Sequence, residues 1–225
     1  MTDRPLSLLV LSTGLSTPSS TRMLADQLAR SSRHALERSG REVEVRTLEL
    51  REYAHDATDA LLTRFPNDRF RALADALREA DAVIAVTPVF NTGPSGLFKT
   101  VIDALDTALW HGKPVLIGAT AGTARHSLTL EYGIRPIFQY LKAEVVPTGV
   151  FAASSDFGTA SSGEADLAPL AARADRAGAE LALMLGARGA AVEEPTEEPA
   201  DESAPATGLD PEFSDFVPLG QLLRR

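Results

Sequence analysis

The sequence of 225 residues contains no cysteine, which excludes disulfide bonds, thiolate catalysis and thiolate metal ligands together. It also has no apolar run near the roughly 20 residues that a membrane-spanning helix requires. At the N-terminus, the basic segment and long apolar stretch of a secretory signal peptide are missing. We therefore expect a cytoplasmic protein without a membrane partner.

Charge is unevenly distributed along the chain, whose formal net charge is -9. From Glu193 onward there are nine acidic residues and only two arginines, Arg224 and Arg225, whereas the preceding part carries 22 acidic and 20 basic residues. A nucleic-acid surface needs a basic patch, so we expect no nucleic-acid partner. The four histidines are scattered without ligand spacing, and no metal site is expected.

Short apolar runs alternate with helical patterns over residues 6–185. This alternation indicates a parallel sheet covered by helices on both faces. We predict an α/β fold, a flavodoxin-like three-layer sandwich whose five-stranded parallel sheet has the order 2-1-3-4-5. The predicted strands are residues 6–11, 42–48, 82–86, 115–119 and a fifth within 144–152 that Pro147 interrupts.

Local signals predict several helix ends. The first helix begins near Thr21 and stops at Gly40, with a weak point at Ser31-Ser32, and Asn67 caps a later helix. Residues 51–66 have no firm period, so we expect a long connection that crosses the mouth of the site.

The chain divides into three predicted parts. Residues 1–186 form the flavodoxin-like domain, and residues 187–208 form a disordered linker rich in Ala, Glu and Pro. Residues 209–225 are apolar again. They are interpreted as a docking peptide or, alternatively, as a frayed tail.

The predicted topology brings together the loops after the first, third and fourth strands, because parallel strands end at one edge. The first loop, residues 12–21, is rich in hydroxyl groups and leads into a helix, where free N–H groups and the helix dipole attract anions. Without a nucleotide-binding glycine motif, it suits a terminal monophosphate; ordinary helix capping is the alternative. The candidate ligand residues are Ser12, Ser19, Ser20 and Thr21.

The other two loops suit a flat heteroaromatic ring. In the central loop, apolar surface adjoins backbone N–H groups and an asparagine amide that can both donate and accept hydrogen bonds. The third loop is small enough for the edge of a ring to lie against its backbone. A simple Pro/Gly loop and a plain turn are the alternatives. The candidates are Thr87, Pro88, Val89, Phe90 and Asn91 in the central loop and Thr120, Ala121 and Gly122 in the third.

The central stretch carries a family resemblance. It reads Thr87-Pro88-Val89-Phe90-Asn91 and then Pro94-x-Gly96-Leu97-x-Lys99. It resembles the P-x-Y-N…P-G-x-L-K element of NAD(P)H-dependent FMN reductases, over about residues 5–185. The stretch Thr123 to Leu128 is similar to the branch paired with luciferase-like two-component flavin monooxygenases. Phe90 stands where a tyrosine is commoner, and Arg22 is one substitute for an arginine that many relatives place near the flavin phosphate.

The resemblance implies hydride transfer from a nicotinamide nucleotide, NADH or NADPH, to FMN, with no catalytic side chain because the cofactor carries the chemistry. It also implies a homodimer or homotetramer and a monooxygenase that receives the reduced flavin. Arg125 and His126, beside the third loop, are interpreted as contacts for the phosphates of the nicotinamide nucleotide or, alternatively, as part of a helix start or a subunit interface. The other functions considered are a quinone or azo reductase, a flavodoxin-type electron carrier, and a binding module that has lost its flavin.

Overall fold

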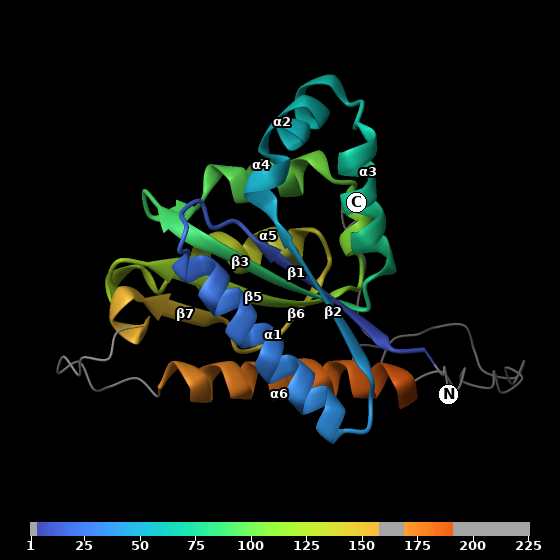
Figure 1. Ribbon diagram of the computed structural model, residues 1–225, viewed down its shortest axis with the longest axis vertical. Helices are drawn as coiled ribbons and strands as arrows, with labels where there is room; N and C mark the ends of the chain where they lie inside the picture. The colour runs from blue at the N-terminus through green and yellow to red at the C-terminus, as the bar shows by residue number, and fades with distance from the viewer. Residues whose placement is uncertain (1–3, 158–168, 191–225) are drawn as a thin grey trace, which may run out of the picture. The chain divides into compact units, whose positions relative to one another are not determined.

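The computed structural model describes residues 4–157 and 169–190, with side chains described up to residue 186. Strands and helices alternate over these residues (Figure 1). The strands are β1 (Leu6–Ser12), β2 (Val43–Glu49), β3 (Ala82–Phe90), β4 (Gly93–Pro94), β5 (Pro114–Ala121), β6 (Glu144–Val145) and β7 (Val150–Ala153). The α-helices are α1 (Ser20–Arg38), α2 (Ala54–Thr63), α3 (Asp68–Glu79), α4 (Gly96–Ala104), α5 (Arg135–Tyr140) and α6 (Leu170–Ala190).

Five short helical turns complete the described elements. Four are 3₁₀ turns, and the fifth is a π-helical turn that leads directly into α5. The 3₁₀ turns are η1 (Leu50–Tyr53), η2 (Thr107–Trp110), η3 (Ala124–His126) and η5 (Ser154–Phe157), and the π turn is η4 (Leu130–Ile134).

The sheet has the order β2-β1-β3-β5-β6, which confirms the predicted flavodoxin-like arrangement. The expected count of five strands is wrong, because the sheet has seven strands within the described residues. Two differences account for this. The two-residue strand β4 folds back antiparallel on β3, and the predicted fifth strand is divided into β6 and β7, which both pair with β5. Pro147 lies in the gap between them and has no N–H group to give to a sheet ladder.

Each central strand is buried on both faces, and its successive side chains enter two different cores. Leu9 and Leu11 of β1 join the core beneath α2, α3, α4 and α5, whereas Leu8 and Val10 join the core beneath α1 and α6. Figure 1 shows these two groups of helices on opposite sides of the sheet. The continuous apolar runs of the sequence therefore reflect burial on two sides.

Helices α1 and α6 pack closely at Gly178. A Cβ atom added there would lie 2.7 Å from the backbone carbonyl carbon of Ser31 and the backbone nitrogen of Ser32. The small residues Ser31 and Ser32 thus mark a close contact between the helices, and α1 continues through the weak point expected there.

The predicted helix ends at Gly40 and Asn67 are confirmed. Gly40 adopts a φ of 78° just after α1, and the Asn67 side chain accepts a hydrogen bond of 2.9 Å from the Phe70 N–H at the start of α3. Residues 51–66 differ from the expected irregular connection, because most of them form η1 and α2. Helix α6 continues past Gly186, and residues 191–225, with most of the predicted linker and the whole apolar C-terminal segment, lie outside the described residues.

Candidate functional site

The carboxyl ends of β1, β3 and β5 lie side by side at one edge of the sheet. In the register of the parallel ladder, Ser12 pairs with Val86, and Pro88 pairs with Thr120. The loops that follow these three strands therefore begin at adjacent positions, on the left of the sheet in Figure 1. This is the edge at which open α/β sheets bind ligands.

Two hydrogen-bond contacts tie the loops together. The hydroxyl oxygens of Thr21, at the start of α1, and Thr120, at the end of β5, lie 2.8 Å apart in a buried contact. The Thr13 N–H and hydroxyl both donate to the Val86 carbonyl oxygen, at 3.1 Å each. The first loop and the start of α1 are thus bonded to β3 and β5.

The structure sorts the predicted ligand residues into two groups by exposure. Buried residues build the edge, and the others face the outside, where a ligand can reach them. The buried ones are Ser12, Thr21, Thr87, Pro88 and Thr120; the half-buried or exposed ones are Ser19, Ser20, Val89, Phe90, Asn91, Ala121 and Gly122.

The first loop turns sharply into α1. The Ser19 hydroxyl accepts a hydrogen bond of 3.2 Å from the Arg22 N–H, which makes Ser19 the N-cap of the helix. A side chain on Gly14 would overlap the Ser19 hydroxyl, so this close approach requires glycine. Within the described residues, the N–H groups of Ser20 and Thr21 have no acceptor, as expected for the first turn of a helix. They offer two donors to an anion beside the cap.

The predicted central loop differs from the structure, because Thr87, Pro88, Val89 and Phe90 are the last residues of β3 and only a tight hairpin turn follows them. Asn91 and Thr92 connect β3 to β4 with φ angles of 49° and 67°, the left-handed values that a two-residue type I′ turn requires. Buried beneath it, the Thr87 hydroxyl accepts a hydrogen bond of 3.1 Å from the Ser95 N–H. Ser95 in turn caps α4 by accepting from the Phe98 N–H. The loop is therefore held rigidly, with Asn91 and the 47% exposed Phe90 at its outer side.

A hollow of about 280 Å³ lies beside the hairpin, lined by Thr92 and by the segment that follows the third loop. The Thr129 hydroxyl donates a hydrogen bond of 3.1 Å to the Thr92 carbonyl oxygen and so joins the hairpin to the wall of this hollow. Arg125 and His126 also line the hollow, which brings this predicted pair next to the central loop. The lining residues are Thr92, Arg125, His126, Leu128, Thr129, Tyr132 and Gly133.

Arg51 is a residue at this edge that the sequence analysis did not single out. It follows the carboxyl end of β2, and its Nη1 atom donates a hydrogen bond of 2.9 Å to the Thr17 hydroxyl in the first loop. Arg22, the expected substitute for a phosphate-binding arginine, donates instead to Asp26 and Glu49. The hydrogen bond to Asp26 raises the pKa of Arg22 above its ordinary value. The signal in the sequence that could have identified Arg51 is its position, because it is a basic residue just beyond the end of a predicted strand.

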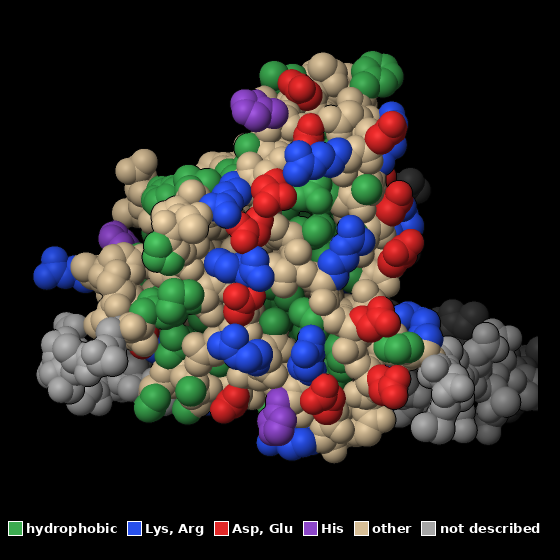
Figure 2. All heavy atoms as spheres, in the orientation of Figure 1, with side chains coloured by type: hydrophobic (Ala, Val, Ile, Leu, Met, Phe, Trp, Pro, Cys, Tyr) green, Lys and Arg blue, Asp and Glu red, His purple; other side chains and the backbone are tan. Residues whose placement is uncertain are grey.

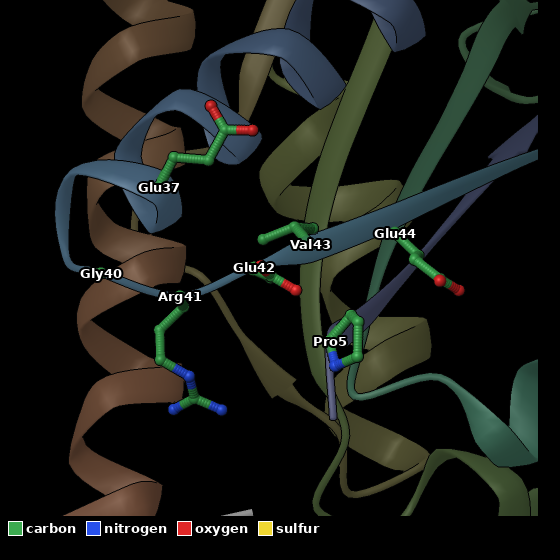
Figure 3. Close-up of a pocket in the computed structure, with 7 residues that line it drawn as sticks. All are labelled: Pro5, Glu37, Gly40, Arg41, Glu42, Val43 and Glu44. Carbon is green, nitrogen blue, oxygen red and sulfur yellow. The ribbon is translucent and has the colours of Figure 1, made fainter. Parts of the chain in front are cut away.

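A hollow of about 440 Å³ lies at the opposite end of β1 and β2. Unlike the carboxyl edge, it does not combine hydroxyl donors with an aromatic ring. Pro5 and Val43, which mark the amino-terminal ends of these strands, contribute to its lining (Figure 3). The side chains of Glu37, Arg41 and Glu44 point away from one another there. Acidic and basic side chains are likewise interspersed over the face shown in Figure 2.

The residues at the carboxyl edge fit a planar ring that carries a phosphate. The first loop supplies hydroxyl and N–H donors with a guanidinium beside them, and the hairpin supplies an aromatic ring and an amide. Among the described residues, no cluster of three or more histidine or acidic side chains could hold a metal ion. None of the helices in the described part of the chain is long and apolar enough to cross a membrane.

Comparison with known proteins agrees with this chemistry. Residues 6–158 match the family model described as NADPH-dependent FMN reductase. The chain is 33% identical to the NADH-dependent FMN reductase SfnF of Pseudomonas fluorescens over 156 residues, which are 69% of this chain and 80% of that protein. It is 37% identical to the FMN reductase (NADPH) of Escherichia coli over 52% of this chain and 60% of that one. An oxidoreductase of Corynebacterium diphtheriae has a similar structure, with a TM-score of 0.75 and 42% identity over 81% of this chain and 98% of that one.

Proposed function

Since the chain belongs to the family of NADPH-dependent FMN reductases, we propose that it uses NADH or NADPH to reduce FMN and passes the reduced flavin to a separate monooxygenase. The membership makes it an oxidoreductase whose flavin is FMN and whose reductant is a nicotinamide nucleotide. The named relatives include both an NADH-dependent and an NADPH-dependent enzyme, and the proposal covers both nucleotides.

When bound, FMN supplies the redox chemistry, because its ring accepts a hydride from the nicotinamide. The task of this chain is to bind and orient the two nucleotides. We assign the flavin phosphate to the first loop, where the N–H groups of Ser20 and Thr21 and the loop hydroxyls are the donors. We assign the ring to the hairpin, where Phe90 offers an apolar face and Asn91 a polar amide. No side chain is proposed as a catalytic acid or base.

The observation that carries the proposal is the joining of the three loops at one rim. The 2.8 Å contact between the Thr21 and Thr120 hydroxyls links the first loop to the third, and the pairing of Pro88 with Thr120 links the third to the hairpin. A phosphate donor set and a ring-binding surface thus lie at the same edge, as a phosphorylated planar ligand requires.

Visible absorption spectroscopy of the purified protein with FMN and NADPH or NADH tests this function. We expect steady consumption of the nicotinamide nucleotide with free FMN as the acceptor. A permanently bound flavin that turns over only with a protein acceptor would instead support an electron carrier. Faster turnover with quinones than with FMN would favour the quinone-reductase alternative. A shorter match to a quinone reductase of Escherichia coli, 38% identical over 79 residues, supports testing this alternative.

The assignment of Asn91 can be separated from its role in the turn. Asn91 has a φ of 49°, so Asn91→Gly keeps the backbone conformation and removes only the amide, whereas Asn91→Ala also strains the turn. We expect Asn91→Gly to weaken FMN binding by roughly 1–2 kcal/mol, the scale of a lost polar contact. Unchanged FMN affinity in Asn91→Gly would remove Asn91 from the site.

The delivery of reduced flavin and the homodimer or homotetramer follow from the family resemblance and are parts of the same proposal, as is a cytoplasmic location. The acidic linker and apolar C-terminal segment are proposed as a tethered docking peptide. Removal of residues 191–225 tests this role. We expect the truncated protein to oxidise NADPH with FMN as before but to support its monooxygenase less well. Equal support by both forms would contradict the docking role.

A further inference from the structure

One carboxylate at the carboxyl end of β2 binds two arginines. Glu49 pairs with Ser12 across the sheet, and its two oxygens lie 2.7 Å from Nη1 of Arg22 and 2.7 Å from Nη2 of Arg51. The Glu49 side chain is 22% exposed, so it is partly shielded from water. The first loop therefore lies next to a fixed group of charges, which includes the last residue of β2, a strand outside the three predicted loops.

The two arginines face in different directions. Arg22 lies on α1, and its Nε atom donates to Asp26 of the same helix at 2.8 Å. Arg51 directs Nη1 to the first loop, where it donates to the Thr17 hydroxyl at 2.9 Å and lies 3.4 Å from the Ser16 carbonyl oxygen. The charge of Arg22 is thus neutralised by two carboxylates. Arg51 has one carboxylate partner, and the other edge of its guanidinium contacts the first loop.

The backbone around Arg51 is well anchored. Its neighbour Leu50 is 1% exposed within the core beneath α2–α5, and Tyr53, at the other end of η1, packs against the same core. The ion pair with Glu49 orients the guanidinium from the opposite side. Arg51 therefore places a positive charge at the loop while its side chain stays one-third exposed to solvent.

We propose that Arg51 is a specificity-determining residue of the flavin site, which favours a flavin that carries a phosphate over one that lacks it. The inference rests on the proposed function, because it concerns the same site. The other donors of the first loop are neutral hydroxyl and N–H groups, which bind a phosphate without a compensating charge. The Arg51 guanidinium supplies that positive charge beside the first loop. The contacts between the flavin ring and the hairpin do not depend on it.

Equilibrium binding of FMN and riboflavin, followed by the quenching of flavin fluorescence, tests the proposal without measuring turnover. Arg51→Met removes the charge and keeps the length of the side chain, and Arg51→Lys keeps the charge. We expect Arg51→Met to weaken FMN binding by about tenfold and to leave riboflavin binding unchanged. Arg51→Lys should keep part of the preference for FMN. The preference should also fall with ionic strength in the natural protein and lose that dependence in Arg51→Met.

Arg22→Met is the matched control, because it removes the other arginine that binds Glu49. It should leave the ratio of the FMN and riboflavin affinities unchanged. An equal loss of affinity for both flavins in the Arg51 variants would show that Arg51 only holds the loop, and an unchanged ratio would show that it does not act on the phosphate. Either result overturns the inference while the natural protein still binds and reduces FMN. If the natural protein binds neither flavin, the proposed function fails as well.

Discussion

The hydroxyls of Thr21 and Thr120 lie 2.8 Å apart in the interior, although 99 positions separate the two residues along the chain. Thr21 lies in the first turn of α1, and Thr120 lies next to the last residue of β5, which β3 separates from β1 in the sheet. The contact spans the point at which the strand order changes direction, where open α/β sheets form their binding crevice. The contact between these two threonines thus stabilises the edge of the sheet at which the candidate site lies.

Removing either hydroxyl should destabilise the fold by about 1–3 kcal/mol, because Thr21→Val or Thr120→Val leaves the partner's buried hydroxyl without a hydrogen bond. The double variant should lose less than the sum of the two single losses, since neither hydroxyl is then left unpaired. Urea denaturation of the four proteins measures this coupling. Strictly additive losses would mean that the two hydroxyls do not stabilise each other.

Thr92→Gly should stabilise the protein by roughly 0.5–1 kcal/mol. Thr92 has a φ of 67°, which is unfavourable for a β-branched side chain, and the substitution creates the Asn-Gly pair preferred in type I′ turns. Thermal unfolding measures the change. Thr92→Ala is the control, because it removes the hydroxyl but keeps the strain. A loss of stability in Thr92→Gly would show that the threonine side chain contributes more than the strain costs.

Two glycines of α6 should respond in opposite directions to alanine. A Cβ at Gly178 would meet the backbone of Ser31 and Ser32 at 2.7 Å, so Gly178→Ala should destabilise the fold by about 1–3 kcal/mol. A Cβ at Gly186 meets nothing within 4 Å, so Gly186→Ala should stabilise it by about 0.5–1 kcal/mol through helix propensity. Chemical denaturation distinguishes the two. Equal effects would contradict the close packing of α1 on α6.

Glu180 should make stability depend on acidic pH. Partial burial raises the pKa of this carboxyl, but hydrogen bonds from the Thr148 hydroxyl and N–H and from Arg176 outweigh it, so that the pKa lies below its ordinary value of 4.5. A lowered folded-state pKa stabilises the protein above pH 4.5, and this contribution disappears as the pH falls through the folded-state value.

Glu180→Gln should therefore cost about 1 kcal/mol at neutral pH and little in strong acid. The pH dependence of the urea midpoint measures this, with Asp175→Asn, a neighbouring carboxylate on α6, as the control. A constant difference between Glu180→Gln and the natural protein from neutral to acidic pH would contradict the lowered pKa.

Local sequence signals predicted the parts of the fold that depend on neighbours along the chain. The apolar runs of β1 and β3 indicated buried strands because a strand covered on both faces consists mostly of apolar residues. Asn67 and Gly40 marked helix ends because capping and left-handed φ angles are properties of single residues. The strand order followed from the alternation of these elements, and with it the edge at which the loops meet.

Contacts between distant residues were not predictable in this way. Residues 51–66 lack a clear period, yet α2 forms there, because packing on the core stabilises a short helix that its own pattern does not. The sequence prediction places a loop directly after residue 86 and contains no hairpin of β3 and β4, because Asn91-Thr92 is a weaker turn signal than Asn-Gly. Arg51 was missed because its contact with Thr17 joins residues 34 positions apart.

The sequence by itself determined the α/β class, the order of the strands and the three loops that gather at their carboxyl ends, since periodicity and turn residues act over short distances along the chain. Only the tertiary structure decided which hydroxyls are used within the protein, which groups face outward, and which arginine reaches the first loop. These depend on the register of the strands and on ion pairs across the sheet, and both arise only when segments far apart in the chain are packed together.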